Sequence, residues 1–123
     1  MLDVESAVKT FMQATGQLNN TDNKITDLRL ALIEEEYSEL LEAIRWGDHT
    51  HIAKEGCDLI YVIVGTLISL GIPFNDCFAA LQTSNLSKLD ANGNALRRPD
   101  GKILKGPDYQ PAEIAIKKIL ATK

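Results

Sequence analysis

Five carboxylates stand in two short segments of this sequence. Glu35, Glu36 and Glu39 form the first group, in EEYSE, and Glu55 and Asp58 form the second, in EGCD. Carboxylates that converge repel one another and lose hydration, so they are either protonated or held by cations. Mg²⁺ prefers oxygen ligands, and when a few carboxylates hold it, it keeps positions for water and for substrate phosphates. The two segments therefore predict chemistry on a phosphate-bearing ligand, provided that a metal binds them.

Helical geometry turns the first group inward. At about 100° per residue, Glu35, Glu36 and Glu39 fall within one arc of a helix. The same arc holds three apolar residues, as a core-facing side would: Leu28, Leu32 and Ala43. A different arc holds the residues expected at the surface: Asp27, Glu34, Ser38, Glu42 and Arg45. A solvated helix face is the simpler explanation of an acidic run, but the orientation of these three glutamates argues against it.

The second group extends an apolar stripe in the same way. Glu55 and Asp58 share a helical face with Val62 and Thr66, ahead of an uncharged stretch over 59–72. That stretch is shorter than the roughly 20 residues of a membrane span, so we expect a buried helix and no membrane partner. Its Ile and Val content leaves a strand over 59–67 as the alternative.

Other metals fit the sequence less well. A di-iron carboxylate bundle uses Glu-x-x-His motifs, and neither histidine lies three residues after a glutamate. A zinc site would combine cysteine and histidine at close spacing, which Cys57 and Cys77 do not offer. We expect both cysteines to be reduced core residues, and His49 and His51 to be surface or helix-capping residues.

The rest of the pattern predicts an all-α fold, a bundle of four main helices plus a C-terminal loop and a short helix. Helical periodicity, with glycines as stops, places the main helices at about 2–15, 25–46, 50–70 and 73–89. A polar, turn-forming connection over 15–24 joins the first two helices. The last helix is expected at about 112–120, where Pro111 begins it.

A basic loop over 90–111 precedes that last helix. Its Gly, Pro, Asn and Asp content predicts a long loop or a small hairpin. Five basic residues stand in or beside it: Lys88, Arg97, Arg98, Lys102 and Lys105. Between Lys88 and Lys105 the only acidic residues are Asp90 and Asp100, so this stretch has a local excess of three positive charges, in a chain whose net charge is −4. An acidic body with a basic loop suits an anionic, metal-bound ligand, and no nucleic-acid partner is expected.

Length and composition predict a single domain over residues 1–123. The chain is 45% hydrophobic and 24% charged, and its length is sufficient for one core without disulfides. The N-terminus does not combine a basic region with a following apolar one, so we expect a cytoplasmic protein.

The two acidic segments resemble the EExxE and ExxD motifs of the MazG-like and phosphoribosyl-ATP pyrophosphohydrolase-like superfamily of all-α nucleotide pyrophosphohydrolases. The resemblance covers about 27–89, including RLALI at 29–33 and LIYV at 59–62. It implies a site that holds Mg²⁺, with Mn²⁺ as a substitute. The metal ligands implied are Glu36, Glu39, Glu55 and Asp58. The residue implied to orient or deprotonate the attacking water is Glu35.

A further resemblance concerns the C-terminal part of the chain. SNLSK at 84–88, RPDGK at 98–102 and KGPDY at 105–109 are similar to the tail of phosphoribosyl-ATP pyrophosphohydrolase-like proteins. The similarity implies two residues near the nucleotide, Asn85 and Lys88. Among the basic residues of the loop, Lys102 and Lys105 are the ones expected to contact phosphate, which gives four substrate-binding residues: Asn85, Lys88, Lys102 and Lys105. A snorkelling lysine at a helix end is the alternative for Lys88, and a solvated loop is the alternative for the other two lysines. The basic tail departs from the enzyme of histidine biosynthesis, so the superfamily name does not define the substrate.

Together these features predict Mg²⁺-dependent hydrolysis of a nucleoside triphosphate at the α-phosphorus, giving nucleoside monophosphate and pyrophosphate. The roles that fit are removal of non-standard nucleotides, control of a deoxynucleotide pool, and hydrolysis of a phosphoribosyl-nucleotide. A non-catalytic nucleotide or metal sensor and a helical interaction module are the alternatives from other classes. The superfamily also implies a homodimer or a homotetramer, and the apolar helix over 59–70 fits burial against a partner.

Overall fold

The structure, a computed structural model, describes residues 1–18 and 23–122, without the side chains of 23–25. It consists of five helices and one two-stranded sheet, which confirms the predicted all-α class. The chain forms two compact units, Met1–Ile72 and Pro73–Lys123. The prediction of a single domain stays a prediction, and each unit is described by itself below.

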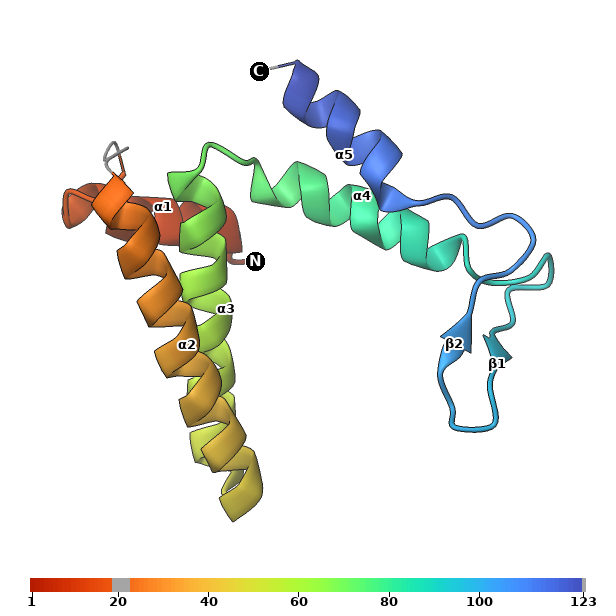
Figure 1. Ribbon diagram of the computed structural model, residues 1–123, viewed down its shortest axis with the longest axis horizontal. Coiled ribbons are helices and arrows are strands. Elements are labelled where there is room, and N and C mark those ends of the chain that lie inside the picture. Colours follow the sequence, from red (N-terminus) through yellow and green to blue (C-terminus); the bar gives the residue numbers. More distant parts are fainter. Residues whose placement is uncertain (19–22, 123) are drawn as a thin grey trace. The chain divides into compact units, whose positions relative to one another are not determined.

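The first unit contains α1 (Val4–Ala14), α2 (Asn23–Trp46) and α3 (His49–Ser69). The long helices α2 and α3 lie side by side as an antiparallel pair, and α1 packs against α3 (Figure 1). The core of this unit includes Val8 and Met12 of α1 and Val64 and Ile68 of α3, all of which are buried. Part of the predicted connection over 15–24 lies outside the described residues.

A tight reversal between α2 and α3 makes this pair possible. Gly47 follows α2 with a φ of 78°, a left-handed conformation that glycine adopts without steric cost. Asp48 then caps α3, and its Oδ1 accepts a hydrogen bond from the backbone N–H of Thr50 at 3.1 Å. The whole of α3 is helical, so the strand considered over 59–67 is wrong.

The buried stripe of α2 is centred on Arg29, Glu36 and Ala43, which recur every seven residues along the contact with α3. The predicted stripe was centred too close to Glu35. As a result, Leu28 and Glu35 were predicted to face inward but are exposed. One packed neighbour covers a narrow strip of a helix, and residues at the margin of the predicted arc lie outside that strip.

The second unit contains α4 (Phe74–Leu86), β1 (Leu96–Arg97), β2 (Ile103–Leu104) and α5 (Ala112–Ala121). Helix α4 ends three residues before the predicted position 89. The reason is that the chain returns to this end of the helix, where the carbonyl oxygen of Lys88 accepts a hydrogen bond from the N–H of Gly106 at 2.8 Å. The two strands are antiparallel, with Leu96 opposite Leu104, so the loop over 90–111 contains the small hairpin considered for it.

The prediction that both cysteines belong to the core is wrong for Cys57, which is exposed, whereas Cys77 is half-buried. Both are free thiols. Within the described residues, no single helix is long and apolar enough to cross a membrane, and α3 and α4 meet that criterion only when they are taken together across the break between them.

Candidate functional site

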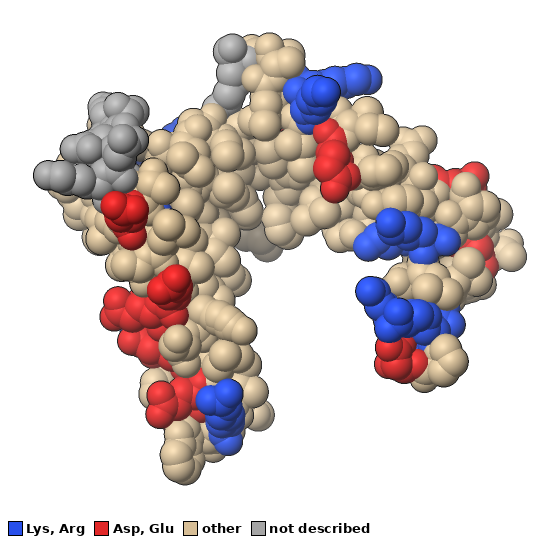
Figure 2. Space-filling model, in the orientation of Figure 1, with Lys and Arg blue, Asp and Glu red and all other residues tan. Residues whose placement is uncertain are grey.

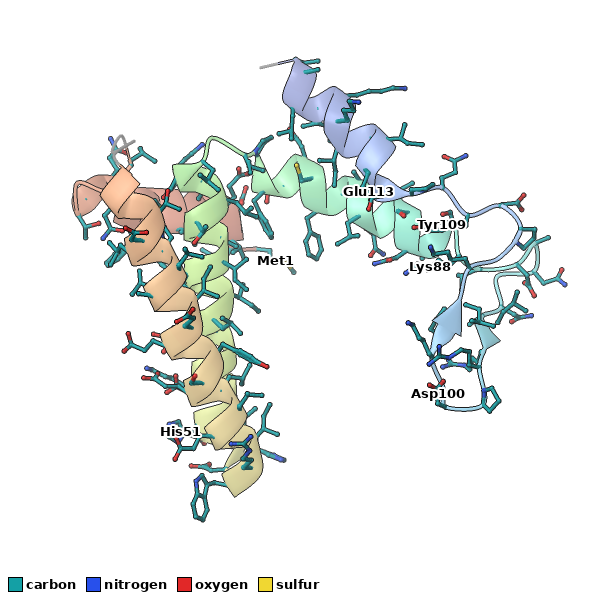
Figure 3. All side chains as sticks on the ribbon, viewed as in Figure 1. Met1, His51, Lys88, Asp100, Tyr109 and Glu113 are labelled. Carbon is teal, nitrogen blue, oxygen red and sulfur yellow. The ribbon has the colours of Figure 1, made fainter. Side chains whose placement is uncertain are left out.

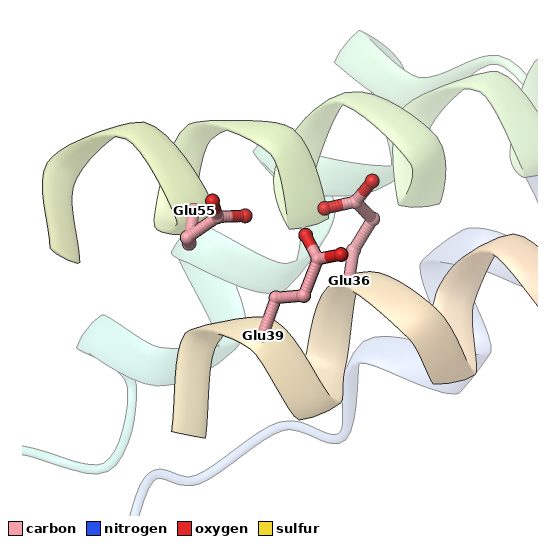
Figure 4. Close-up of side chains that lie close together, drawn as sticks. All are labelled: Glu36, Glu39 and Glu55. Carbon is pink, nitrogen blue, oxygen red and sulfur yellow. The ribbon is translucent and has the colours of Figure 1, made fainter. Parts of the chain in front are cut away.

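Three glutamates meet where α2 and α3 pack together. Glu36 and Glu39 project from α2 toward Glu55 of α3 (Figure 4). One carboxylate oxygen from each lies within 4.8 Å of the others. The antiparallel pairing explains the convergence. Because α2 and α3 run in opposite directions, the turn of α2 that carries Glu36 and Glu39 faces the turn of α3 that carries Glu55. The inward registers predicted for these three residues therefore lead to one place.

The electrostatics of this cluster are those of crowded like charges. Burial and the charge of Asp58 raise the pKa of Glu36 above its ordinary value. A hydrogen bond with Glu55, together with partial desolvation, raises the pKa of Glu39 to about 7. Without a cation, the cluster therefore retains a proton close to neutral pH. Metal ligands must be deprotonated, so a cation and this proton compete for the same oxygens.

The donor set fits a hard divalent cation. Glu55 is only 5% exposed, and Oε2 of Glu55 and Oε2 of Glu36 are both buried without a hydrogen-bond partner in the described part of the chain. Buried carboxylate oxygens without partners are costly, and a cation is the usual compensation. All the donors are oxygens, which suits Mg²⁺ rather than zinc.

Asp58 lies beside this cluster and is paired with a lysine. Its Oδ2 is 2.5 Å from Nζ of Lys54, one turn earlier on α3, and the same Nζ lies 3.7 Å from Oε1 of Glu55. His51 also approaches, with Nε2 3.3 Å from Oε1 of Glu55 (Figure 3 shows where His51 lies). His51 is exposed, as predicted for a surface residue, whereas Lys54 was not predicted to lie at the site. The i, i+4 spacing of both pairs could have revealed them.

An open cavity of about 710 Å³ adjoins the cluster toward the reversal between α2 and α3. Its lining includes two members of the cluster and five further residues: Glu39, Glu55, Glu42, Ala43, Trp46, His51 and Lys54. Trp46 is 80% exposed, which is high for so large an aromatic side chain. The cavity therefore combines carboxylates, cationic or hydrogen-bonding groups and an aromatic ring.

Glu35, the predicted catalytic residue, is exposed on α2, and its charge is one of the smaller influences that raise the pKa of Glu36. It lies next to the cluster and not within the set of three converging oxygens. Its role as the residue that activates water stays a prediction.

The four predicted substrate-binding residues belong to the second unit. Asn85 is exposed near the end of α4, Lys88 is half-buried just beyond it, and Lys102 and Lys105 are exposed in the hairpin segment. Figure 2 shows basic side chains over this segment, whereas acidic ones gather over α2 and α3. The side chain of Lys105 lies above the ring of Tyr109, 4.9 Å from its centre.

Hydrogen bonds to two serines and close packing of a glycine bring Lys88 and the segment around Lys105 together. Ser84, 5% exposed, donates its hydroxyl to the carbonyl of Gln110 at 2.7 Å, and the N–H of Gln110 donates to Oγ of Ser87 at 2.9 Å. Gly106 packs so closely that a methyl group there would lie 2.5 Å from the carbonyl oxygen of Lys88. Segments that are distant in sequence thus form one basic surface, with Lys88 and Tyr109 both labelled in Figure 3.

Fold and site together define an all-α protein whose two longest helices carry a carboxylate centre suited to a divalent cation. A family model described as phosphoribosyl-ATP pyrophosphohydrolase matches residues 8–85, more than half of the chain, and the protein belongs to that family. The predicted resemblance is thereby confirmed, and nucleotide pyrophosphohydrolase activity in general follows from it. None of the curated proteins matches the chain. The family match ends before Lys88, so the roles of the three lysines in the tail stay predictions.

Proposed function

We propose that this protein hydrolyses a nucleoside triphosphate, or a related nucleotide, at the α-phosphorus to give the nucleoside monophosphate and pyrophosphate. The observation that carries the proposal is the convergence of Glu36, Glu39 and Glu55, in a member of a pyrophosphohydrolase family. Mg²⁺, or Mn²⁺ in its place, would be held by these residues and Asp58. The ion would polarise the phosphoryl group and lower the pKa of a bound water.

The residues of the chain have separable tasks in this reaction. Glu36, Glu39 and Glu55 would hold the cation, and Glu39 would have to give up its proton to do so. Lys54 pairs with Asp58 and Glu55, and a cation bound by these carboxylates would compete with it. Glu35, exposed to solvent beside the cluster, orients or deprotonates the attacking water.

The cavity beside the cluster supports a nucleoside as the part of the substrate next to the α-phosphate. It is lined by Glu39 and Glu55, and Trp46 offers an exposed ring on which a base could stack. Asn85, Lys88, Lys102 and Lys105 belong to the second unit and are the further residues proposed to bind substrate, through an amide group and positive charges. Cleaning of non-standard nucleotides or control of a nucleotide pool is the physiological role proposed.

A homodimer is the proposed assembly, with a homotetramer as the larger form. The support is the number of large apolar side chains that α2 and α3 leave exposed: Leu28, Leu30, Leu41, Ile44, Ile60, Tyr61 and Ile63. An exposed apolar surface of this extent is characteristic of interfaces between subunits.

Product analysis with a panel of nucleoside triphosphates and Mg²⁺ tests the proposal, with Glu39→Gln as the inactivated variant and the exposed Glu34→Gln as its matched control. We expect equal amounts of monophosphate and pyrophosphate, lost in Glu39→Gln and retained in Glu34→Gln. Mg²⁺-dependent nucleotide binding without turnover would indicate a non-catalytic sensor and not an enzyme. Absence of binding as well would leave a helical interaction module.

A further inference from the structure

Arg29 is a buried cation that the proposed reaction does not use. It lies on α2 and is only 6% exposed. Its Nε and Nη1 atoms are buried and have no hydrogen-bond partner among the residues that the structure describes. Burial lowers the pKa of its guanidinium below the ordinary value. A guanidinium has five N–H donors in a planar fork, so two nitrogens without partners leave much of its hydrogen-bonding capacity unused.

Gly65 of α3 provides the place where this guanidinium lies. A methyl group at Gly65 would come 2.8 Å from Nη2, 3.0 Å from Nη1 and 3.3 Å from Cζ of Arg29. The guanidinium therefore rests against the backbone of α3 at a position where any side chain larger than hydrogen would displace it. Glycine at this position lowers the stability of α3, because it is a poor helix former in an interior turn.

This arrangement is unfavourable for the protein by itself. A buried charge that lacks hydrogen bonds lowers the free energy of unfolding, because it has lost its hydration without compensation. An apolar side chain of similar size in its place would be neutral or stabilising. Local arrangements that disfavour folding are concentrated at sites that bind something. The unused donors of Arg29 therefore point to an anionic ligand.

The position of Arg29 indicates which anion. Arg29 and Glu36 lie seven residues apart on the same stripe of α2, which corresponds to about 10 Å along the helix. The cavity with Trp46 lies on the opposite side of Glu36 along α2. A nucleotide with its base in that cavity and its α-phosphate at the carboxylates would extend its remaining phosphates toward Arg29.

We propose that Arg29 forms a phosphoryl-binding site at the contact between α2 and α3, and that it takes the terminal end of the substrate's phosphate chain, which leaves as pyrophosphate. The identity of this group rests on the proposed function. The anion site itself rests only on the burial of Arg29, its N–H groups without partners among the described residues, and the packing of its guanidinium against Gly65. A guanidinium binds phosphate with two parallel N–H···O bonds, which the free Nε and a terminal nitrogen can supply once the side chain turns toward the ligand.

Thermal unfolding of the full chain with inorganic pyrophosphate, in EDTA and at constant ionic strength set with chloride, tests this site without any metal. We expect pyrophosphate to raise the melting temperature of the unmodified protein. Arg29→Met should raise the melting temperature without ligand, because it removes a poorly paired buried charge, and should reduce the rise with pyrophosphate. Arg45→Met, which removes an exposed arginine from the same helix, should do neither.

Calorimetric titration gives the second readout. Arg29→Met should weaken pyrophosphate binding by about tenfold or more, the loss expected for a charge-assisted hydrogen bond, and leave binding of a nucleoside monophosphate unchanged. Glu39→Gln should retain the pyrophosphate response in EDTA.

Three results would overturn the inference: no stabilisation of the unmodified protein by pyrophosphate, an undiminished response in Arg29→Met, or a lower melting temperature of Arg29→Met without ligand. The last would mean that Arg29 is already paired in the native assembly, for instance with a carboxylate of a second copy. If Arg29 binds pyrophosphate but no nucleotide is hydrolysed with Mg²⁺, the proposed function fails and the anion site stands. If the unmodified protein hydrolyses nucleotides and Arg29→Met binds pyrophosphate as tightly as the unmodified protein, the proposed function stands and the anion site fails.

Discussion

Two glycines of α3 should respond in opposite ways to the same substitution. Gly56→Ala adds a methyl group whose nearest neighbour is Cδ1 of Leu40 at 3.9 Å, an ordinary van der Waals contact. Gly65→Ala adds one that would lie 2.8 Å from a terminal nitrogen of Arg29. Both glycines are inside a helix, so alanine improves the helix propensity equally at the two sites, by about 1 kcal/mol.

The difference between the two variants isolates the cost of displacing the guanidinium. Gly56→Ala should raise the free energy of unfolding by about 1 kcal/mol, or roughly 3–5 °C in melting temperature. At Gly65 the same gain is opposed by overpacking, typically about 1–3 kcal/mol, because Arg29 is buried and must shift as a whole. Gly65→Ala should therefore be neutral or destabilising by up to about 2 kcal/mol.

A double-mutant cycle completes this experiment. Methionine is unbranched and flexible, so in an Arg29→Met background the methyl group at Gly65 should be accommodated and Gly65→Ala should approach the effect of Gly56→Ala. Urea unfolding of the four proteins of the cycle should give an interaction energy of about 1–3 kcal/mol. Equal stabilisation by Gly65→Ala and Gly56→Ala in the unmodified protein would refute the placement of Arg29 against α3.

Three further predictions concern the carboxylate cluster and its cavity. Lys54→Met should tighten Mg²⁺ binding, measured by calorimetry without nucleotide, because Lys54 competes with the cation for Asp58. The expected gain is roughly two- to fivefold, since an exposed ion pair contributes at most about 1 kcal/mol. Unchanged or weaker binding would show that Lys54 does not compete with the cation. Without metal, the raised pKa of Glu39 contributes stability that is fully present below the pKa of the unfolded chain and is lost as the pH rises through about 7. The melting temperature should therefore be lower at pH 8 than at pH 5.5, and this difference should be smaller in Glu39→Gln. An equal difference in both proteins would contradict the assignment. Trp46 is the single tryptophan of the chain, so a nucleoside monophosphate should quench its fluorescence whereas pyrophosphate should not, and equal responses to both would exclude base stacking on Trp46.

Much of the helical framework could be predicted from the sequence because local signals agree with one another. The reversal at Gly47 and Asp48 combines a glycine stop with a capping aspartate, and the structure uses both. Apolar periodicity and length favoured a helix for 59–67 over a strand, and the structure agrees. The end of α4 was predicted too late because it depends on Gly106, which returns from a distant part of the chain.

The carboxylate cluster was predicted only in part, for a geometric reason. Helical registers alone could place Glu36, Glu39 and Glu55 on facing sides, and these three do converge. The exact line of contact between α2 and α3 is a tertiary property, and it leaves Glu35 exposed.

Two residues that the sequence did not single out are Lys54 and Arg29. Lys54 approaches Asp58 through i, i+4 spacing on α3, a signal that was present but that surface residues also produce. Arg29 precedes Glu36 by seven residues, and Ala43 follows at the same interval, so a heptad reading of α2 would have placed Arg29 in the contact. Its significance comes from burial without hydrogen-bond partners, which no sequence pattern reveals.

Hydrolysis in ¹⁸O-labelled water tests the central claim most directly. The purified protein is incubated with Mg²⁺ and an accepted nucleoside triphosphate, and both products are analysed by mass spectrometry. Attack of water at the α-phosphorus predicts the label in the nucleoside monophosphate and none in the pyrophosphate, with no product when EDTA replaces Mg²⁺. Label in the pyrophosphate, release of inorganic phosphate as the first product, or full turnover in EDTA would contradict the account.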